Sequence, residues 1–150
     1  ETVGVGAVKY FDLSQNPQSD INFDWDRSLA LQGNTAPYLM YAHARCCSIL
    51  RKADGYDAGA PIVLGTPEER ELAMRLLRLP EVVDQAARTY KPSTIADHLY
   101  QITESYGRFY GACTVLGSPE QASRLALVAA TAGALRRGLS LLGIGAPERM

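Results

Sequence analysis

Apolar residues in the second half of the chain recur every three or four positions. The first apolar stripe comprises Leu99, Ile102, Tyr106, Phe109 and Cys113. The second comprises Leu125, Val128, Ala132, Leu135, Leu139 and Leu142. Such spacing places every member of a stripe on one face of a helix. Because each face needs an apolar partner, the pattern predicts an all-α fold, an antiparallel helical bundle.

Turn and capping residues divide the rest of the chain into shorter helices. We expect them over residues 3–13, Asp24–Leu31, Ala36–Ala53, 67–79 and 81–90, with turn chemistry over 14–24. Asn34 or Thr35 is the expected N-cap of the third helix. Thr66-Pro67-Glu68-Glu69 has the pattern of a capping box with proline at the first helical position. Pro80 disfavours helical geometry in the residue before it, which predicts the break near Leu79.

Composition narrows the choice of function. The 150 residues carry a net charge of −1 and only three cysteines, Cys46, Cys47 and Cys113, without zinc-like spacing. We therefore expect no metal site, no catalytic residues, and a reducing, cytoplasmic setting. No apolar run approaches the roughly 20 residues that cross a bilayer, so no membrane partner is expected. The charge balance argues against a protein that coats duplex nucleic acid.

The predicted helix over Ala36–Ala53 has two contrasting faces. At 100° per residue, one face comprises Tyr38, Tyr41, Arg45, Ser48 and Lys52. The opposite face comprises Leu39, His43, Cys46, Cys47 and Leu50, so it reads as core and His43 as a hydrogen-bonded structural residue. Tyrosine rings and a guanidinium suit single-stranded RNA, whose bases stack on aromatic planes. Half-buried tyrosines beside a solvated arginine explain the same spacing, and spacing alone leaves both interpretations open.

Several separated strings resemble one family. They are Gly4-Val5-Gly6-Ala7-Val8-Lys9-Tyr10, Phe23-Asp24-Trp25-Asp26-Arg27, Gly33-Asn34-Thr35-Ala36-Pro37-Tyr38, Tyr41-Ala42-His43-Ala44-Arg45, and the ending Pro147-Glu148-Arg149-Met150. In this order they are similar to the carboxyl-terminal, anticodon-binding region of class I arginyl-tRNA synthetases. One string departs from the family, since Gly133-Ala134-Leu135-Arg136 stands where an Asp-Ala-Leu-Arg string is usual. We expect Gly133 to mark a close approach between helices.

The resemblance implies a function and a set of site residues. Tyr38, Tyr41, Arg45, Tyr110 and Met150 match positions that contact the anticodon in the family, although Tyr110 is equally compatible with a core role. The implied division is residues 1–30 as the trailing segment of a catalytic half and residues 31–150 as the anticodon-binding bundle of the class I synthetase type. The implied partners are the anticodon loop of arginine tRNA and the protein's own catalytic domain.

The family's catalytic motifs, of the His-Ile-Gly-His and Lys-Met-Ser-Lys-Ser types, do not occur in the sequence. Because the chain also opens on Glu1, we expect it to be part of a longer arginine–tRNA ligase and to be non-catalytic alone. ATP with magnesium is then a cofactor of the full-length enzyme, and none is expected for this part. The competing interpretations are a helical module that binds protein partners through an apolar groove and a small enzyme that uses His43 or His98.

Overall fold

The computed structural model describes residues 2–16, 20 and 22–150, and within these ranges the chain forms helices and no strand. The helices are α1 (Thr2–Leu13), α2 (Trp25–Ser28), α3 (Ala36–Lys52), α4 (Pro67–Leu77), α5 (Leu79–Thr89), α6 (Ser93–Ala112) and α7 (Gln121–Leu141). The predicted all-α class is confirmed. Of the predicted turn over 14–24, residues 17–19 and 21 lie outside the described residues.

Helix starts follow the capping chemistry of the sequence. The Thr35 hydroxyl accepts a hydrogen bond from the backbone N–H of Tyr38, so Thr35 is the N-cap of α3. Thr66 and Glu69 form the predicted capping box at the start of α4. Such reciprocal bonds satisfy N–H groups that a helix start otherwise leaves without partners. Arg78 separates α4 from α5, close to the break expected before Pro80.

The helix predicted over Asp24–Leu31 is much shorter than expected, because α2 ends at Ser28. Leu29 and Leu31 are exposed, so little apolar contact stabilises a further helical turn. Short helices depend on such packing for their stability.

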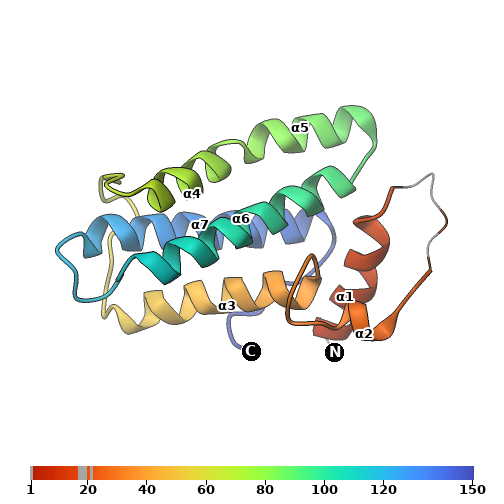
Figure 1. Cartoon of the computed structure of the whole chain (residues 1–150), viewed down its shortest axis with the longest axis horizontal. Coiled ribbons are helices and arrows are strands. Elements are labelled where there is room, and N and C mark those ends of the chain that lie inside the picture. Colours follow the sequence, from red (N-terminus) through yellow and green to blue (C-terminus); the bar gives the residue numbers. More distant parts are fainter. Residues whose placement is uncertain (1, 17–19, 21) are drawn as a thin grey trace.

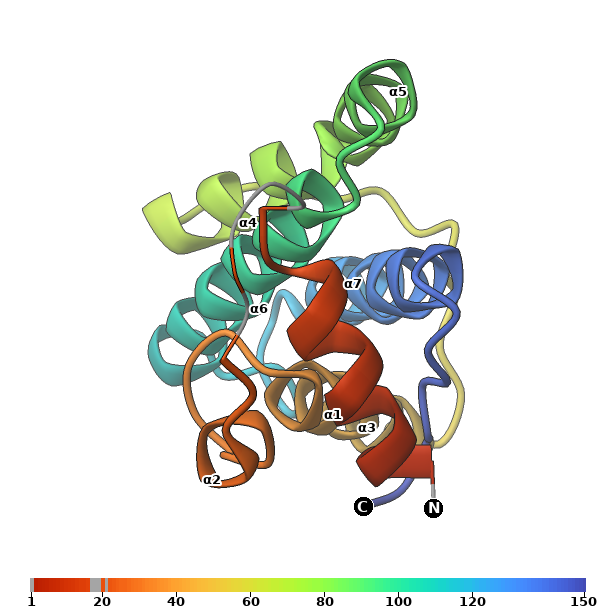
Figure 2. The same cartoon turned by 90° about the vertical axis from the view of Figure 1, so that its right-hand side faces the viewer.

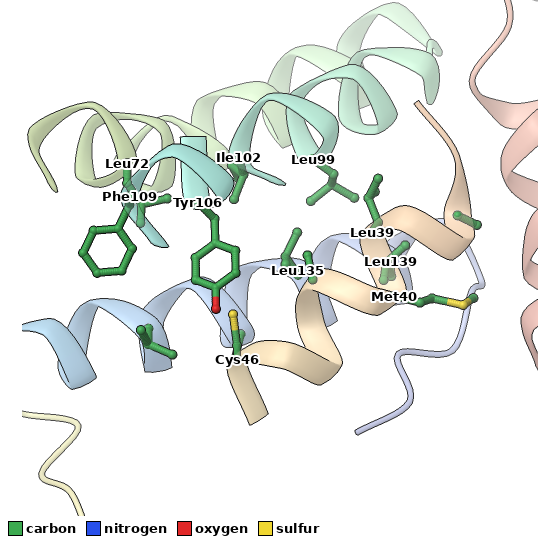
Figure 3. Packing of buried hydrophobic residues seen from close by; sticks show 14 of the residues in the cluster. Leu39, Met40, Cys46, Leu72, Leu99, Ile102, Tyr106, Phe109, Leu135 and Leu139 are labelled. Atoms are coloured by element: carbon green, nitrogen blue, oxygen red, sulfur yellow. The ribbon is translucent and has the colours of Figure 1, made fainter. Parts of the chain in front are cut away.

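Helices α3, α6 and α7 lie side by side and form the centre of the molecule (Figure 1). The chain colours show that α7 runs opposite to both α3 and α6. The pair α4 and α5 covers α6 on one side, and α1 packs across the beginning of α3 (Figure 2). Figure 3 shows the buried side chains between these helices, where Leu39 and Leu99 face Leu135 and Leu139.

Two glycines let neighbouring elements approach closely. A Cβ atom on Gly138 of α7 would lie 2.3 Å from Cδ2 of Leu99, and one on Gly6 of α1 would lie 2.3 Å from Cε of Met40. Gly133 was predicted to mark such an approach, and that prediction is wrong. Nothing lies within 4 Å of a Cβ placed there, so the close contact occurs five residues later.

Helix α1 shares the core with the rest of the bundle. Tyr10 is buried, and its hydroxyl lies 2.9 Å from the carbonyl of Ala96 and 2.6 Å from Oδ1 of Asn34. The domain boundary near residue 30 remains a prediction.

Two further properties of the described residues bear on function. None of their helices has the length and apolar character needed to cross a bilayer. The same residues contain no group of three or more His, Cys, Asp or Glu side chains placed to hold a metal ion.

Candidate nucleic-acid interface

One groove collects most of the residues that the sequence singled out. It has a volume of roughly 500 Å³ and lies between α3, the end of α6 and the last residues of the chain. Its lining comprises Tyr41, Ala44, Arg45, Ser48, Ile49, Arg51, Lys52, Tyr110, Glu148, Arg149 and Met150. Residues far apart in sequence thus form a single surface, with Tyr110 and Met150 beside the Tyr41 and Arg45 face.

Arg45 lies between two aromatic rings. Its guanidinium carbon is 4.1 Å from the ring centroid of Tyr110 and 5.7 Å from that of Tyr41. Both distances fall within the range of cation–π attraction. Both rings remain partly open to solvent, with 44% of Tyr41 and 39% of Tyr110 exposed. Together the three side chains form a partly exposed platform of two aromatic rings and one positive charge.

The groove is more positive than the chain as a whole. Arg45, Arg51, Lys52 and Arg149 line it, and Glu148 is the carboxylate among its lining residues. Within the part of the chain that the structure describes, no carboxylate forms an ion pair with any of these four cations. A local excess of cations that are not paired with carboxylates attracts polyanions even when the net charge of the chain is −1.

Tyr38 lies outside this groove. Its hydroxyl donates a 2.8 Å hydrogen bond to Oε1 of Glu104, and its ring centroid lies 6.2 Å from that of Tyr100. Burial, helped by Glu104, raises the pKa of Tyr38 to about 12. The predicted face therefore divides, with Tyr41 and Arg45 in the groove and Tyr38 packed between α3 and α6. A role for Tyr38 in RNA contact stays a prediction.

The C-terminal tail, residues 143–150, returns from the end of α7 to α3 (Figure 2). Nδ1 of His43 lies 3.0 Å from the carbonyl oxygen of Pro147. Both Nη atoms of Arg51 lie 3.3 Å from the carbonyl oxygen of Glu148. His43 is 3% exposed, in agreement with its interpretation as a hydrogen-bonded structural residue.

Sequence reasoning did not find the contacts that Arg51 makes with the tail. His43, Cys47 and Arg51 are spaced four residues apart and form one ridge of α3. That spacing was visible in the sequence, but the backbone carbonyls that the ridge meets were not.

A second pocket of roughly 330 Å³ lies on the other side of the tail, between α3 and α7. His43, Cys47, Tyr56 and Arg136 contribute to its lining, and it shares Arg51 and Glu148 with the groove. Arg51 and Glu148, which belong to α3 and to the tail, therefore lie between the two concave surfaces.

Comparison with known proteins assigns this architecture to a class. Residues 39–150 match the family described as the DALR anticodon binding domain, and the chain belongs to that family. Over 150 residues it is 49% identical to the arginine–tRNA ligase of Laribacter hongkongensis, covering 99% of this chain and 26% of that protein. It is 50% identical over 159 residues to the arginine–tRNA ligase of Chloroflexus aggregans, covering 100% of this chain and 27% of that protein. The chain thus spans about a quarter of the length of these relatives.

Solved structures agree with this assignment. The chain superposes on the arginyl-tRNA synthetase of Thermus thermophilus with a TM-score of 0.92 and 39% identity, covering 99% of this chain and 27% of that one. The Plasmodium falciparum enzyme gives a TM-score of 0.90 and 31% identity, with the same coverage. The resemblance to arginyl-tRNA synthetases drawn from the sequence is confirmed, as is the bundle type.

Proposed function

We propose that this chain binds the anticodon loop of arginine tRNA. It does so for a catalytic domain that attaches arginine to the tRNA with ATP and magnesium. The observation that carries the proposal is the Arg45 guanidinium between the partly exposed rings of Tyr41 and Tyr110, in a groove that the end of the tail lines.

The chemistry of the groove suits unpaired bases. An anticodon base that is turned out of its stack needs an aromatic plane to replace the lost stacking, and each such contact is worth about 1–3 kcal/mol. The tyrosine rings supply the planes, and the guanidinium donates hydrogen bonds to base edges or phosphates. The neighbouring Lys52 and Arg149 add attraction for the backbone.

The genetic code gives this site a definite target. All arginine codons have guanine at the middle position, so every arginine tRNA carries cytosine at the centre of its anticodon. Cytosine presents O2 and N3 as acceptors, which an arginine or a backbone N–H satisfies. A site that holds a few unstacked bases needs no large basic surface, and this agrees with a net charge of −1.

The test is a titration of fluorescently labelled arginine tRNA with the 150-residue chain, followed by anisotropy at two salt concentrations. The comparison RNA differs only in its central anticodon base. We expect the altered RNA to bind about 1–3 kcal/mol more weakly. Equal binding of the two RNAs refutes recognition of the central base. Absence of binding to both, even at the lower salt concentration, rejects the proposal and leaves the protein-interaction module as the alternative.

A further inference from the structure

We propose that His43 and Arg51 are positioning residues, which hold the C-terminal tail against α3 and thereby form one wall of the groove. The part of this inference that concerns RNA rests on the proposed function. The part that concerns the tail does not. His43 does not line the groove and Arg51 lines it as a cation, so the proposal gives both residues a role that acts through the tail.

The hydrogen bond to Pro147 fixes the tautomer of His43. A carbonyl oxygen only accepts, so Nδ1 of His43 carries the proton in this 3.0 Å contact. In the neutral ring, Nε2 is then an acceptor, and Sγ of Cys47 lies 3.7 Å from it. The same sulfur lies 4.0 Å from Nδ1, so the Cys47 thiol packs against the imidazole ring and is not aligned with one ring nitrogen. The directed hydrogen bond of His43 is therefore the one that Nδ1 donates to the Pro147 carbonyl.

Arg51 completes the anchor one residue further along the tail. Both of its terminal nitrogens meet the Glu148 carbonyl oxygen, so the side chain is held by two contacts. Helical side chains lean toward the N-terminus of their helix, and Arg51 accordingly reaches back over Cys47 toward His43. Two consecutive tail carbonyls, those of Pro147 and Glu148, are thus bound by one ridge of α3.

The anchored carbonyls immediately precede the residues that reach the groove. Glu148, Arg149 and Met150 line it, and Met150 is 54% exposed. A chain end rarely stays ordered unless other groups hold it in place. Within the described residues, the hydrogen bonds that hold segment 146–150 are those to His43 and Arg51. Loss of these bonds releases the wall of the groove without altering Tyr41, Arg45 or Tyr110.

The first experiment measures tail release without RNA. Digestion with carboxypeptidase, followed by mass spectrometry, reports how fast Arg149 and Met150 are removed. We expect His43→Leu and Arg51→Met each to accelerate removal about fivefold or more, because cleavage follows the population of the open tail. His43→Asn should restore part of the protection, since its amide can donate where Nδ1 did. Unchanged rates in both His43→Leu and Arg51→Met overturn the proposal.

The chain contains a matched control for His43→Leu. His98 is also buried, and its Nε2 lies 2.9 Å from a backbone carbonyl, that of Arg75 on α4. His98→Leu removes an equivalent hydrogen bond far from the tail, so it should leave the digestion rate unchanged. An equal acceleration in both histidine variants would show general loosening and would overturn the assignment. Arg51 is exposed, so Arg51→Met keeps the test valid if His43→Leu does not fold.

The second experiment separates positioning from general stability. The affinity for arginine tRNA is measured for four proteins. These are the wild type and His43→Leu, each with the complete tail and with a tail shortened to end at Ala146. We expect His43→Leu to weaken binding about fivefold in the whole chain and less than about twofold in the shortened one, because contacts that act through one element are not additive. An equal loss in both backgrounds contradicts a role through the tail. If no variant binds tRNA, the proposed function fails while the digestion result still decides whether the tail is anchored.

Discussion

Arg124 and Arg45 carry the same guanidinium group in two contrasting parts of the molecule. On α7, Nε of Arg124 lies 2.8 Å from Oε1 of Glu69, and its Nη1 lies 3.2 Å from Glu120 and 2.8 Å from the Thr114 carbonyl. Only 12% of its side chain is exposed. On α3, Arg45 has two tyrosine rings for neighbours, and no carboxylate pairs with it within the described residues.

The difference lies in whether the hydrogen-bond donors of each arginine are occupied. Acceptors from α4 and from the loop before α7 bind the N–H donors of Arg124. These donors are therefore not available to a ligand. The aromatic faces attract the charge of Arg45 but do not accept hydrogen bonds from the N–H groups that lie in the plane of its guanidinium. These N–H donors therefore remain available to a ligand. An arginine is thus a candidate for ligand contact when its neighbours hold it in place and leave its donors free.

Removal of Arg124 should have the largest effect on stability. Arg124→Ala leaves the carboxylate of Glu69, whose side chain is 2% exposed, without its cation. Breaking a buried ion pair in this way typically costs about 3–5 kcal/mol. Urea unfolding followed by circular dichroism at 222 nm should show a much lower midpoint. A loss of unfolding free energy below about 1 kcal/mol would mean that the pair contributes no more than a solvent-exposed salt bridge. The contrast with Arg45 would then not hold.

Arg45→Ala should have the opposite profile. Binding of arginine tRNA should weaken by about 1–3 kcal/mol, measured by anisotropy, because a base or phosphate loses its cationic partner. Folding stability should fall by at most about 1 kcal/mol, the scale of exposed cation–π contacts. Arg137→Ala is the control, since Arg137 is exposed on α7 and does not line the groove. A large drop in stability for Arg45→Ala would mean that the residue is structural, as Arg124 is.

Acid should weaken the ion pair between Arg124 and Glu69. Burial opposes ionisation of Glu69, but hydrogen bonds from Arg124 and from the backbone of Thr66 and Gly65 outweigh it and lower the pKa below the ordinary 4.5. A lowered carboxyl pKa stabilises the fold above the unfolded value, and this stability is lost as the pH falls through the folded value.

The measurement is unfolding free energy between about pH 6 and about pH 3 for wild type and Glu69→Gln. We expect the wild type to lose more stability over this range, because the variant has no carboxyl to protonate at this position. Parallel curves for the two proteins would show that the Glu69 pKa is not shifted by folding.

The smallest effect is expected for a buried hydroxyl whose polar neighbour is a weakly hydrogen-bonding thiol. Among the described residues, the Tyr106 hydroxyl is the buried side-chain oxygen without a hydrogen bond of regular geometry, and it points toward the sulfur of Cys46 (Figure 3). Tyr106→Phe should therefore be neutral or slightly stabilising in urea unfolding. Tyr38→Phe is the matched comparison, because it breaks the bond to Glu104 and should cost about 1 kcal/mol. A loss in Tyr106→Phe as large as in Tyr38→Phe would show that the buried hydroxyl makes a hydrogen bond of ordinary strength.

Local chemistry made much of the fold predictable. The capping box at Thr66, the N-cap at Thr35 and the apolar stripes of α6 and α7 depend on residues close in sequence, and the helices follow them. The length of α2 was wrong because Leu29 and Leu31 lie exposed, and the sequence pattern does not reveal that they lack packing partners. Gly133 was misassigned because helix spacing does not reveal which turn of α7 meets Leu99.

The candidate site was predictable only in part, for a similar reason. Helical periodicity brought Tyr41 and Arg45 together, whereas Tyr110 and Met150 entered through family resemblance. The groove depends on where the chain end crosses α3, and the contacts of Arg51 and Glu148 that set this crossing involve a backbone carbonyl. Backbone groups carry no signal in the sequence.

The tail also has a consequence for the order of folding. Lys9 donates to the Gly143 carbonyl across 134 residues, His43 meets Pro147 across 104, and Arg51 meets Glu148 across 97. Such long closures lose much chain entropy unless the helices that bear the partners already lie together. We therefore expect the tail to be among the last segments to dock and among the first to exchange its amide hydrogens. The wall of the groove should then form only after α1 and the C-terminal tail have packed against α3. An intact wall would therefore indicate that folding of the bundle is complete.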